Sequence, residues 1–175
     1  MKTLFKVLFV FLAVFAFTGN VMAQSTKEEK QAAKTAAIKK MVDSNKYVFV
    51  ANFAIPQRGG QKSLSGDYDL KVLPDTIIAY LPYYGRSHMA PTDLSGDGGI
   101  KFKSTNFSYK TVQNKNGSWQ VTIKPKDNNI SDWRDVQQLY LNITTSGYAS
   151  LQVTSSNRDP ISYQGYIEAV KKQKQ

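Results

Sequence analysis

The sequence predicts a mainly β (α+β) fold, an antiparallel β-sandwich or barrel of seven to nine strands with an N-terminal helix. From residue 47 onward, apolar residues recur at every second position, which is the period of a strand with one buried face. Turn signals such as Asn116-Gly117 and Ser146-Gly147 recur at hairpin spacing. Residues 46–170 contain neither an internal repeat nor a low-complexity linker, so we expect one antiparallel β domain there.

The first 23 residues have the layout of a secretory signal peptide. Lys2 and Lys6 precede an apolar run over 8–17, and Ala23 ends a peptidase site of small or modest residues. That run is about half the roughly 20 residues that a membrane-spanning helix needs. We therefore expect cleavage before Gln24 and an exported mature chain, periplasmic or secreted, with no membrane span.

The absence of cysteine and the excess of lysine both narrow the function classes. Without cysteine, disulfides, thiolate metal ligands, cysteine nucleophiles and a cysteine-linked lipid are excluded. The formal net charge is +10 for the whole chain and +8 once residues 1–23 are removed. The lysines are spread along the chain and show no dense basic-aromatic run, which favours a solvated cationic surface over a nucleic-acid partner.

A helix is expected over 24–45. Ser25-Thr26 followed by Glu28-Glu29 is a helix start, with acidic side chains in the first turn where they meet the helix dipole. The apolar stripe that follows is thin, so the helix should be partly exposed and pack as an appendage. Its members are Ala33, Ala36, Ala37, Ile38, Met41 and Val42.

Alternation assigns the strands and their buried faces. The first strand, over 47–55, places Phe49, Ala51, Phe53 and Ile55 on one face and ends at Pro56. In later strands the alternating residues are Tyr68, Leu70 and Val72; Trp119, Val121 and Ile123; Leu139, Leu141 and Ile143; Ala149, Leu151 and Val153; and Ile161, Tyr163, Gly165 and Ile167. We predict in particular that Phe53, Val121, Leu141 and Leu151 point inward.

Three connecting segments complete the predicted layout. Asn116-Gly117 indicates a hairpin with a type I′ turn, which requires positive φ at both central residues. Trp133 is the one apolar anchor of a polar loop or short helix over 124–135. Residues 171–175 form a basic tail.

Five spaced motifs carry a resemblance to a known family. They are Tyr80-Leu-Pro-Tyr-Tyr-Gly-Arg-Ser-His-Met-Ala-Pro91, Gly98-Gly-Ile-Lys-Phe102, Gly117-Ser-Trp119, Gly147-Tyr-Ala-Ser-Leu151 and Asn157-Arg-Asp-Pro-Ile-Ser-Tyr-Gln-Gly165. Together they resemble a family of uncharacterised exported domains found mainly in gut and environmental Bacteroidetes, over roughly residues 44–170. The resemblance implies a bacterial envelope or secreted protein and no established activity. An aromatic residue is usual in that family at the position of His88, which argues against a catalytic role for this histidine.

The best candidate site is the segment 81–88, with Tyr83, Tyr84, Arg86 and His88 as ligand-binding residues. Clustered tyrosines beside an arginine could stack on sugar rings or clamp an anionic group, because both side chains combine a flat face with hydrogen-bond donors. The alternative interpretation is structural. In it, the tyrosines cover a barrel end while Pro82 and Gly85 shape the bend.

No metal site and no cofactor are expected. Asp93, Ser95 and Asp97 match the first half of a calcium loop, but Ser104 stands where a bidentate carboxylate is required. These three residues are therefore only a weak alternative to a plain glycine turn. A single histidine and no thiol are a poor start for a zinc site.

The protein is not expected to be an enzyme. No Gly-x-Ser-x-Gly elbow surrounds any serine. Glycoside cleavage would require two carboxylates to converge in space, out of Asp67, Asp69, Asp127, Asp132 and Asp135. The sequence instead predicts an exported envelope protein that acts as a non-enzymatic binding module for a small-molecule or glycan ligand. The alternative is a structural or interaction protein that meets another envelope protein, and a hydrolase is a distant third.

Overall fold

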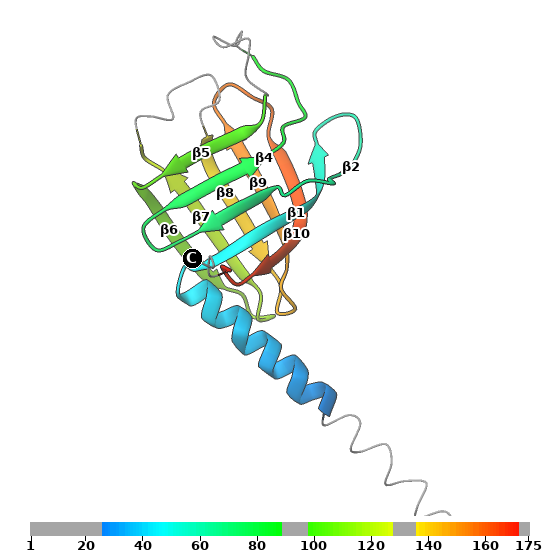
Figure 1. Ribbon diagram of the computed structural model, residues 1–175, viewed down its shortest axis with the longest axis vertical. Helices are drawn as coiled ribbons and strands as arrows, with labels where there is room; N and C mark the ends of the chain where they lie inside the picture. Colours follow the sequence, from blue (N-terminus) through cyan, green and yellow to red (C-terminus); the bar gives the residue numbers. More distant parts are fainter. Residues whose placement is uncertain (1–25, 89–97, 128–135, 172–175) are drawn as a thin grey trace, which may run out of the picture. The chain divides into compact units, whose positions relative to one another are not determined.

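The computed structural model of the protein describes residues 26–88, 98–127 and 136–171 (Figure 1). The chain divides into two compact units, one ending at Ala37 and the other beginning at Ile38. A helix runs over 26–43, and its last turns belong to the second unit together with all the strands. The expectations for Trp133, for the possible calcium ligands and for most of the basic tail lie outside the described residues.

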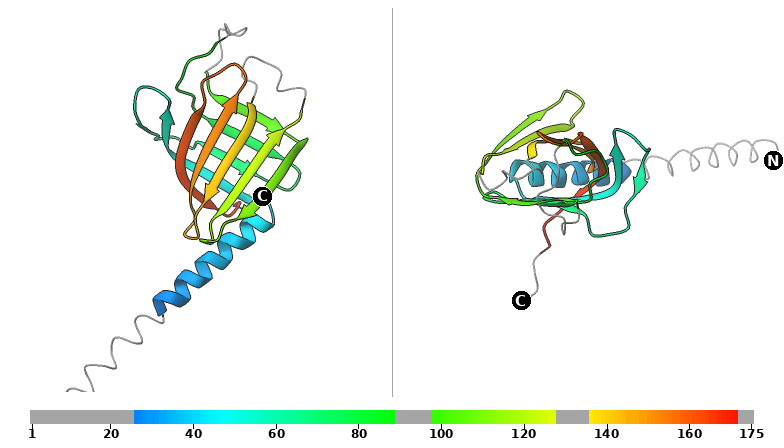
Figure 2. Two further views of the ribbon diagram at one scale, coloured as in Figure 1. Left: turned by 180° about the vertical axis from the view of Figure 1, so that it is seen from behind. Right: turned by 90° about the horizontal axis from the view of Figure 1, so that it is seen from above.

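Nine strands of the described chain form one antiparallel sheet that curls into a nearly closed barrel (Figures 1 and 2). The order across the sheet is β5-β4-β3-β1-β10-β9-β8-β7-β6, and β2 pairs with β1 beside this path. This arrangement confirms the predicted mainly β fold as a barrel. The strands are β1 (Tyr47–Pro56), β2 (Lys62–Ser63), β3 (Asp69–Val72), β4 (Ile77–Leu81), β5 (Ile100–Ser104), β6 (Phe107–Gln113), β7 (Trp119–Pro125), β8 (Val136–Ile143), β9 (Tyr148–Ser155) and β10 (Ile161–Glu168).

The inner face of the barrel carries one apolar core, as alternation predicts. Val121, Leu141 and Leu151 lie opposite one another on β7, β8 and β9, and each is fully buried. Ile38 and Val42, in the last turns of the helix, are buried in the same cluster. Because side chains of a strand alternate between faces, the residues between these core positions point outward and are available for other roles.

Phe53 is an exception, and the prediction that it points inward is wrong. The register between β1 and β10 shifts between Ala51 and Phe53. This bulge reverses the alternation for the rest of β1, because one extra residue exchanges the two faces. Ala54 is therefore buried, while Phe53 is 37% exposed. Gly165 pairs with Ala51 beside the bulge, where an added Cβ would collide with the backbone carbonyl of Val50.

The hairpin between β6 and β7 is confirmed, but its turn is not type I′. Gly117 has a φ of 81°, and Asn116 does not have a positive φ. The N–H of Gly117 donates to the carbonyl of Asn114 at 2.9 Å, and the N–H of Asn114 donates to the carbonyl of Ser118 at 2.8 Å. This is a turn closed by a single left-handed glycine, the usual form of a slightly longer hairpin loop. Gly147 (φ 86°) ends the β8–β9 turn in the same way.

The two end strands of the sheet, β5 and β6, are joined directly, and a carboxylate holds their connection. Asp127, just after β7, accepts hydrogen bonds from the N–H groups of Thr105 at 2.9 Å and Asn106 at 3.1 Å. A hydrogen bond from Ser104, together with these two amides, lowers the pKa of Asp127. The ionised Asp127 therefore links the β5–β6 connection, where the barrel nearly closes, to the end of β7.

Candidate functional site

The predicted ligand-binding residues follow β4 and are held by the turn that precedes β10. The hydroxyl of Tyr83 lies 2.9 Å from the carbonyl oxygen of Arg86 and 3.0 Å from that of Asp159. The N–H of Asp159 also donates to the Arg86 carbonyl, at 3.1 Å. The hydroxyl of Tyr163, on the inner face of β10, donates to the carbonyl of Pro82 at 2.6 Å, and burial raises the pKa of this hydroxyl. The segment is thus fixed to the barrel at several points.

Arg158 is the residue of this region that the sequence interpretation did not single out. It is 3% exposed, and its guanidinium carbon lies 4.3 Å from the centroid of the Tyr83 ring. Burial raises the pKa of the Tyr83 hydroxyl, and the positive charge of Arg158 opposes that shift. Only its place in the Asn157–Gly165 motif set Arg158 apart, since nothing local distinguishes a buried arginine from a surface one.

Tyr84, Arg86 and His88 have different surroundings. The Lys62 ammonium lies 5.3 Å from the centroid of the Tyr84 ring. The side chain of Arg86 is exposed, and its backbone carbonyl makes the contacts described above. His88 Nε2 lies 3.1 Å from Asp159 Oδ1, although the His88 side chain is 62% exposed. The structure therefore brings Tyr83 and His88 to one turn through Asp159, while Tyr84 meets β2.

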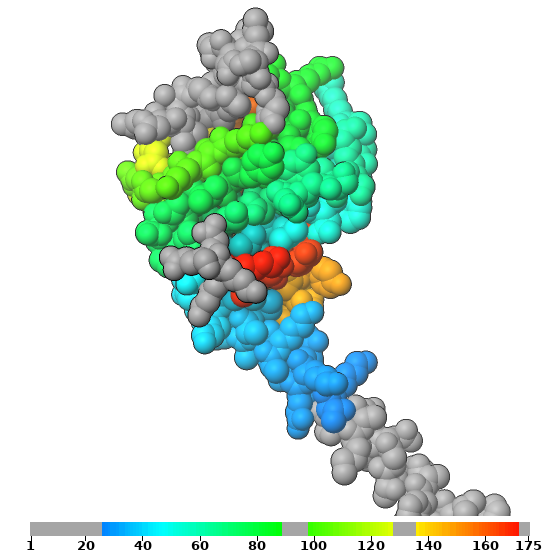
Figure 3. All heavy atoms as spheres, viewed as in Figure 1, coloured from blue at the N-terminus to red at the C-terminus, as the bar shows by residue number. Residues whose placement is uncertain are grey.

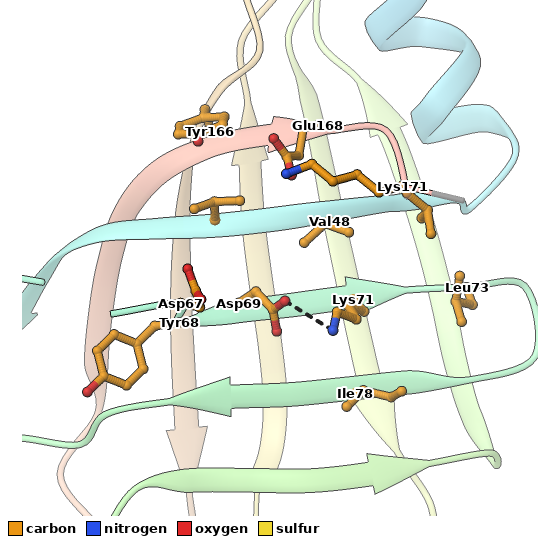
Figure 4. Close-up of a pocket in the computed structure, with 12 residues that line it drawn as sticks. Val48, Asp67, Tyr68, Asp69, Lys71, Leu73, Ile78, Tyr166, Glu168 and Lys171 are labelled. Atoms are coloured by element: carbon orange, nitrogen blue, oxygen red, sulfur yellow. Dashed lines mark ion pairs between the residues drawn. The ribbon is translucent and has the colours of Figure 1, made fainter. Parts of the chain in front are cut away.

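A groove of about 790 Å³ lies elsewhere, on the outer face of β10, β1, β3 and β4 (Figure 4). The register places its side chains in two rows across the strands. One row runs from Tyr166 through Val50 to Asp69, and the other contains Glu168, Val48, Lys71 and Ile78. Val170 and Lys171, at the end of the described chain, also line the groove. In Figure 3 this end is red and lies on the surface below the cyan strand.

The groove combines aromatic rings with an apolar floor. Val48, Val50 and Ile78 form the floor, and Tyr166 is 38% exposed beside it. The ring of Tyr68 stacks on that of Tyr80, with centroids 5.7 Å apart and planes inclined by 16°. Fixed aromatic rings next to apolar side chains provide flat surfaces for a ligand.

The groove is lined by three carboxylates and two lysines, and four of these five side chains form two neighbouring pairs of opposite sign. Lys71 Nζ lies 3.4 Å from Asp69 Oδ2, and Lys171 Nζ lies 3.6 Å from Glu168 Oε1. Both lysine side chains are substantially exposed, at 47% and 86%. Exposed pairs of this kind contribute only about 0–1 kcal/mol to stability. Because the two lysines are exposed, their donors are accessible to a ligand. With Asp67 as the third carboxylate, the lining carries one more acidic than basic side chain.

The described residues hold no group of three histidine, aspartate or glutamate side chains that could bind a metal ion. Of the carboxylates considered for glycoside cleavage, Asp67 and Asp69 both line the groove, whereas Asp127 holds the β5–β6 connection. Asp132 and Asp135 lie outside the described residues, as do Asp93, Ser95 and Asp97. Among the described helical residues, no segment has the length and hydropathy needed to cross a lipid bilayer.

Comparison with known proteins places this geometry in a family. The model of a domain of unknown function, DUF4251, matches residues 29–167. The crystal structure of a DUF4251 family protein from Bacteroides eggerthii DSM 20697 has a similar fold, with a TM-score of 0.60 and 16% sequence identity over 79% of this chain and 91% of that chain. No curated protein matches the chain. Because the family match extends from the helix into β10, the chain belongs to the DUF4251 family of domains of unknown function.

Proposed function

We propose that the protein is an exported, non-enzymatic binding module that holds a glycan in the groove over β10, β1, β3 and β4. The observation that carries the proposal is the combination, in one groove of about 790 Å³, of tyrosine rings, an apolar floor and paired charges. Ligand sites commonly have volumes of about 300–1,000 Å³ and combine apolar walls with a few polar groups.

A glycan fits this combination for two reasons. The C–H face of a sugar ring can pack on an aromatic ring, here Tyr68 or Tyr166. Its hydroxyl groups both donate and accept, so they can bond to the carboxylates of Asp69 and Glu168 and to the ammonium of Lys71. Because the groove presents three carboxylates together with two ammonium groups, a neutral, hydroxyl-rich ligand suits it better than an ion of either sign.

The loop over 82–88 is a less favourable place for the same ligand. The hydroxyl of Tyr83 and the carboxylate of Asp159 already bond to other parts of the chain. Arg158 packs against one face of the Tyr83 ring. An added Cβ at Gly85 would also meet the Tyr83 hydroxyl. These contacts favour the structural interpretation of the loop, in which it supports the end of the barrel.

Export is part of the proposal and has its own test. The support for it is the signal-peptide layout of residues 1–23. We expect the mature protein to begin at Gln24, and intact-mass analysis of protein from the envelope fraction measures this directly. A mass that retains residues 1–23 would contradict export by cleavage.

Glycan binding is tested with a matched pair of tyrosine variants. Tyr148 and Tyr166 are cross-strand partners on the outer face, but only Tyr166 lines the groove. We expect a glycan array to identify an oligosaccharide ligand, and Tyr166→Ala to weaken its binding about tenfold, the effect of losing roughly 1.4 kcal/mol of ring contact. Tyr148→Ala should bind as the wild type does. Equal losses in the two variants, or no glycan bound by the wild type, would reject the proposal.

A further inference from the structure

The outer face of β6, β7 and β8 has a depression of about 340 Å³ that differs in kind from the glycan groove. Its lining consists of Ser108 and Lys110 on β6, Thr122 and Lys124 on β7, and Gln138 on β8. Every one of these side chains can donate a hydrogen bond, and none of them carries negative charge. The depression therefore favours a ligand that accepts hydrogen bonds.

The register sets the two lysines diagonally across the strand pair. Ser108 lies opposite Lys124, and Lys110 lies opposite Thr122, so ammonium and hydroxyl groups alternate around the depression. Diagonal neighbours on one face of a sheet are within reach of long side chains. Two like charges at this separation repel each other, and an anion seated between them would remove the repulsion.

The surrounding chain supplies no counter-charge in its described part. Residues 107–126 and 136–155, which contain β6 to β9, include no aspartate or glutamate. The next acid along the chain, Asp127, already accepts from the backbone amides of Thr105 and Asn106. In the groove, by contrast, Lys71 and Lys171 each have a carboxylate neighbour. The charge of Lys110 and Lys124 is thus left for a ligand.

We propose that this depression is a second binding site and that it takes a tetrahedral oxyanion with two negative charges, the phosphate monoester group. Two ammonium groups match the two charges, and the hydroxyls of Ser108 and Thr122 with the amide of Gln138 supply donors to the oxygens. Such a group occurs on phosphorylated small molecules and polymers and on the headgroup of phosphatidic acid. The site is on other strands than the glycan groove, so the two proposals stand or fall separately.

The test is a titration of the mature chain, labelled with ¹⁵N, with glycerol phosphate at constant ionic strength. We expect saturable shifts of amide signals centred on residues 108–110, 122–124 and 138. Lys110→Gln and Lys124→Gln should each weaken binding about five- to tenfold. Lys115→Gln, which removes the same charge from the β6–β7 turn outside the depression, should leave binding unchanged. Shifts that do not saturate, or an equal effect of Lys115→Gln, would show non-specific attraction and overturn the proposal.

Two further arms sharpen the identity of the ligand. Lowering the pH from 7.5 to 5 adds a proton to the phosphate monoester, whose second pKa is about 6, and should weaken binding several-fold. Unchanged affinity over that range would overturn the requirement for two charges. Co-sedimentation with phosphatidylcholine vesicles that contain phosphatidic acid then separates the sources. Binding lost in Lys110→Gln assigns the site to the lipid headgroup, and absence of vesicle binding assigns it to soluble or polymer-borne phosphate.

Discussion

The outer face of the barrel over β10, β1, β3 and β4 and the outer face over β6, β7 and β8 are built by the same alternation but carry different chemistry. On the first, lysines lie beside carboxylates and tyrosines. On the second, Lys110 and Lys124 lie among hydroxyl and amide groups, with no acidic side chain in the described parts of these strands. Because both faces cover one apolar core, packing holds the barrel together and leaves the outward positions free to differ.

The largest expected effect on stability tests whether inner and outer positions differ as described. Leu141 is fully buried on β8, and its neighbour Asn142 points outward and is exposed. We expect Leu141→Ala to lower the free energy of unfolding by about 2–5 kcal/mol, because truncation leaves a cavity. Asn142→Ala should change it by less than about 0.5 kcal/mol. Urea melts of the two variants measure both values, and equal effects would invalidate the strand assignment.

A smaller effect distinguishes Arg86, in the loop over 82–88, from Arg158, in the turn that precedes β10. Arg158 is buried against Tyr83, whereas the Arg86 side chain is exposed. Arg158→Met should cost about 1–2 kcal/mol, since the cation–π contact is lost at a desolvated position. Arg86→Met should stay within about 0.5 kcal/mol. If Arg86→Met lost more free energy of unfolding than Arg158→Met in the same urea melts, the contact between Arg158 and Tyr83 would not be what holds the loop.

The hydrogen bonds from the Thr105 and Asn106 amides to Asp127 should make the stability of the protein depend on pH. The pKa of Asp127 is lowered in the folded state, so its stabilising contribution is present above the unfolded value near 4 and is lost as the pH falls through the folded value. We expect Asp127→Asn to lower the melting temperature at pH 7 and the difference from the wild type to shrink below about pH 4. A difference in melting temperature that is constant from pH 7 to pH 2 would contradict a stabilising role of the ionised Asp127.

The smallest expected effect on stability is at the two binding faces themselves. Tyr166→Ala and Lys110→Gln should each change the free energy of unfolding by less than about 0.5 kcal/mol, because both side chains lie outside the core. Thermal melts of these variants check this value. Values above 1 kcal/mol would mean that these faces contribute to folding, and binding losses in the same variants would then have to be reinterpreted.

The accuracy of the sequence-based prediction depended on whether a signal was local. Alternation identified Val121, Leu141 and Leu151 as core residues because a strand with one buried face repeats every two residues. It failed at Phe53, because a bulge depends on how two strands pair and has no reliable local signature. The turn at Asn116-Gly117 was predicted as a hairpin, and only its type was wrong.

The amino-acid sequence was sufficient to predict the fold class and the core positions of most strands. Those features follow from neighbours along the chain. The tertiary structure was needed to show that the sheet curls into a nearly closed barrel, that Arg158 packs against the Tyr83 ring, and that two dissimilar surfaces form on the outside. The groove and the depression depend on register, which brings side chains such as Tyr166 and Asp69 together from strands far apart in the sequence. Outward positions tolerate many residue types, so no local sequence pattern predicts the groove or the depression that they form together.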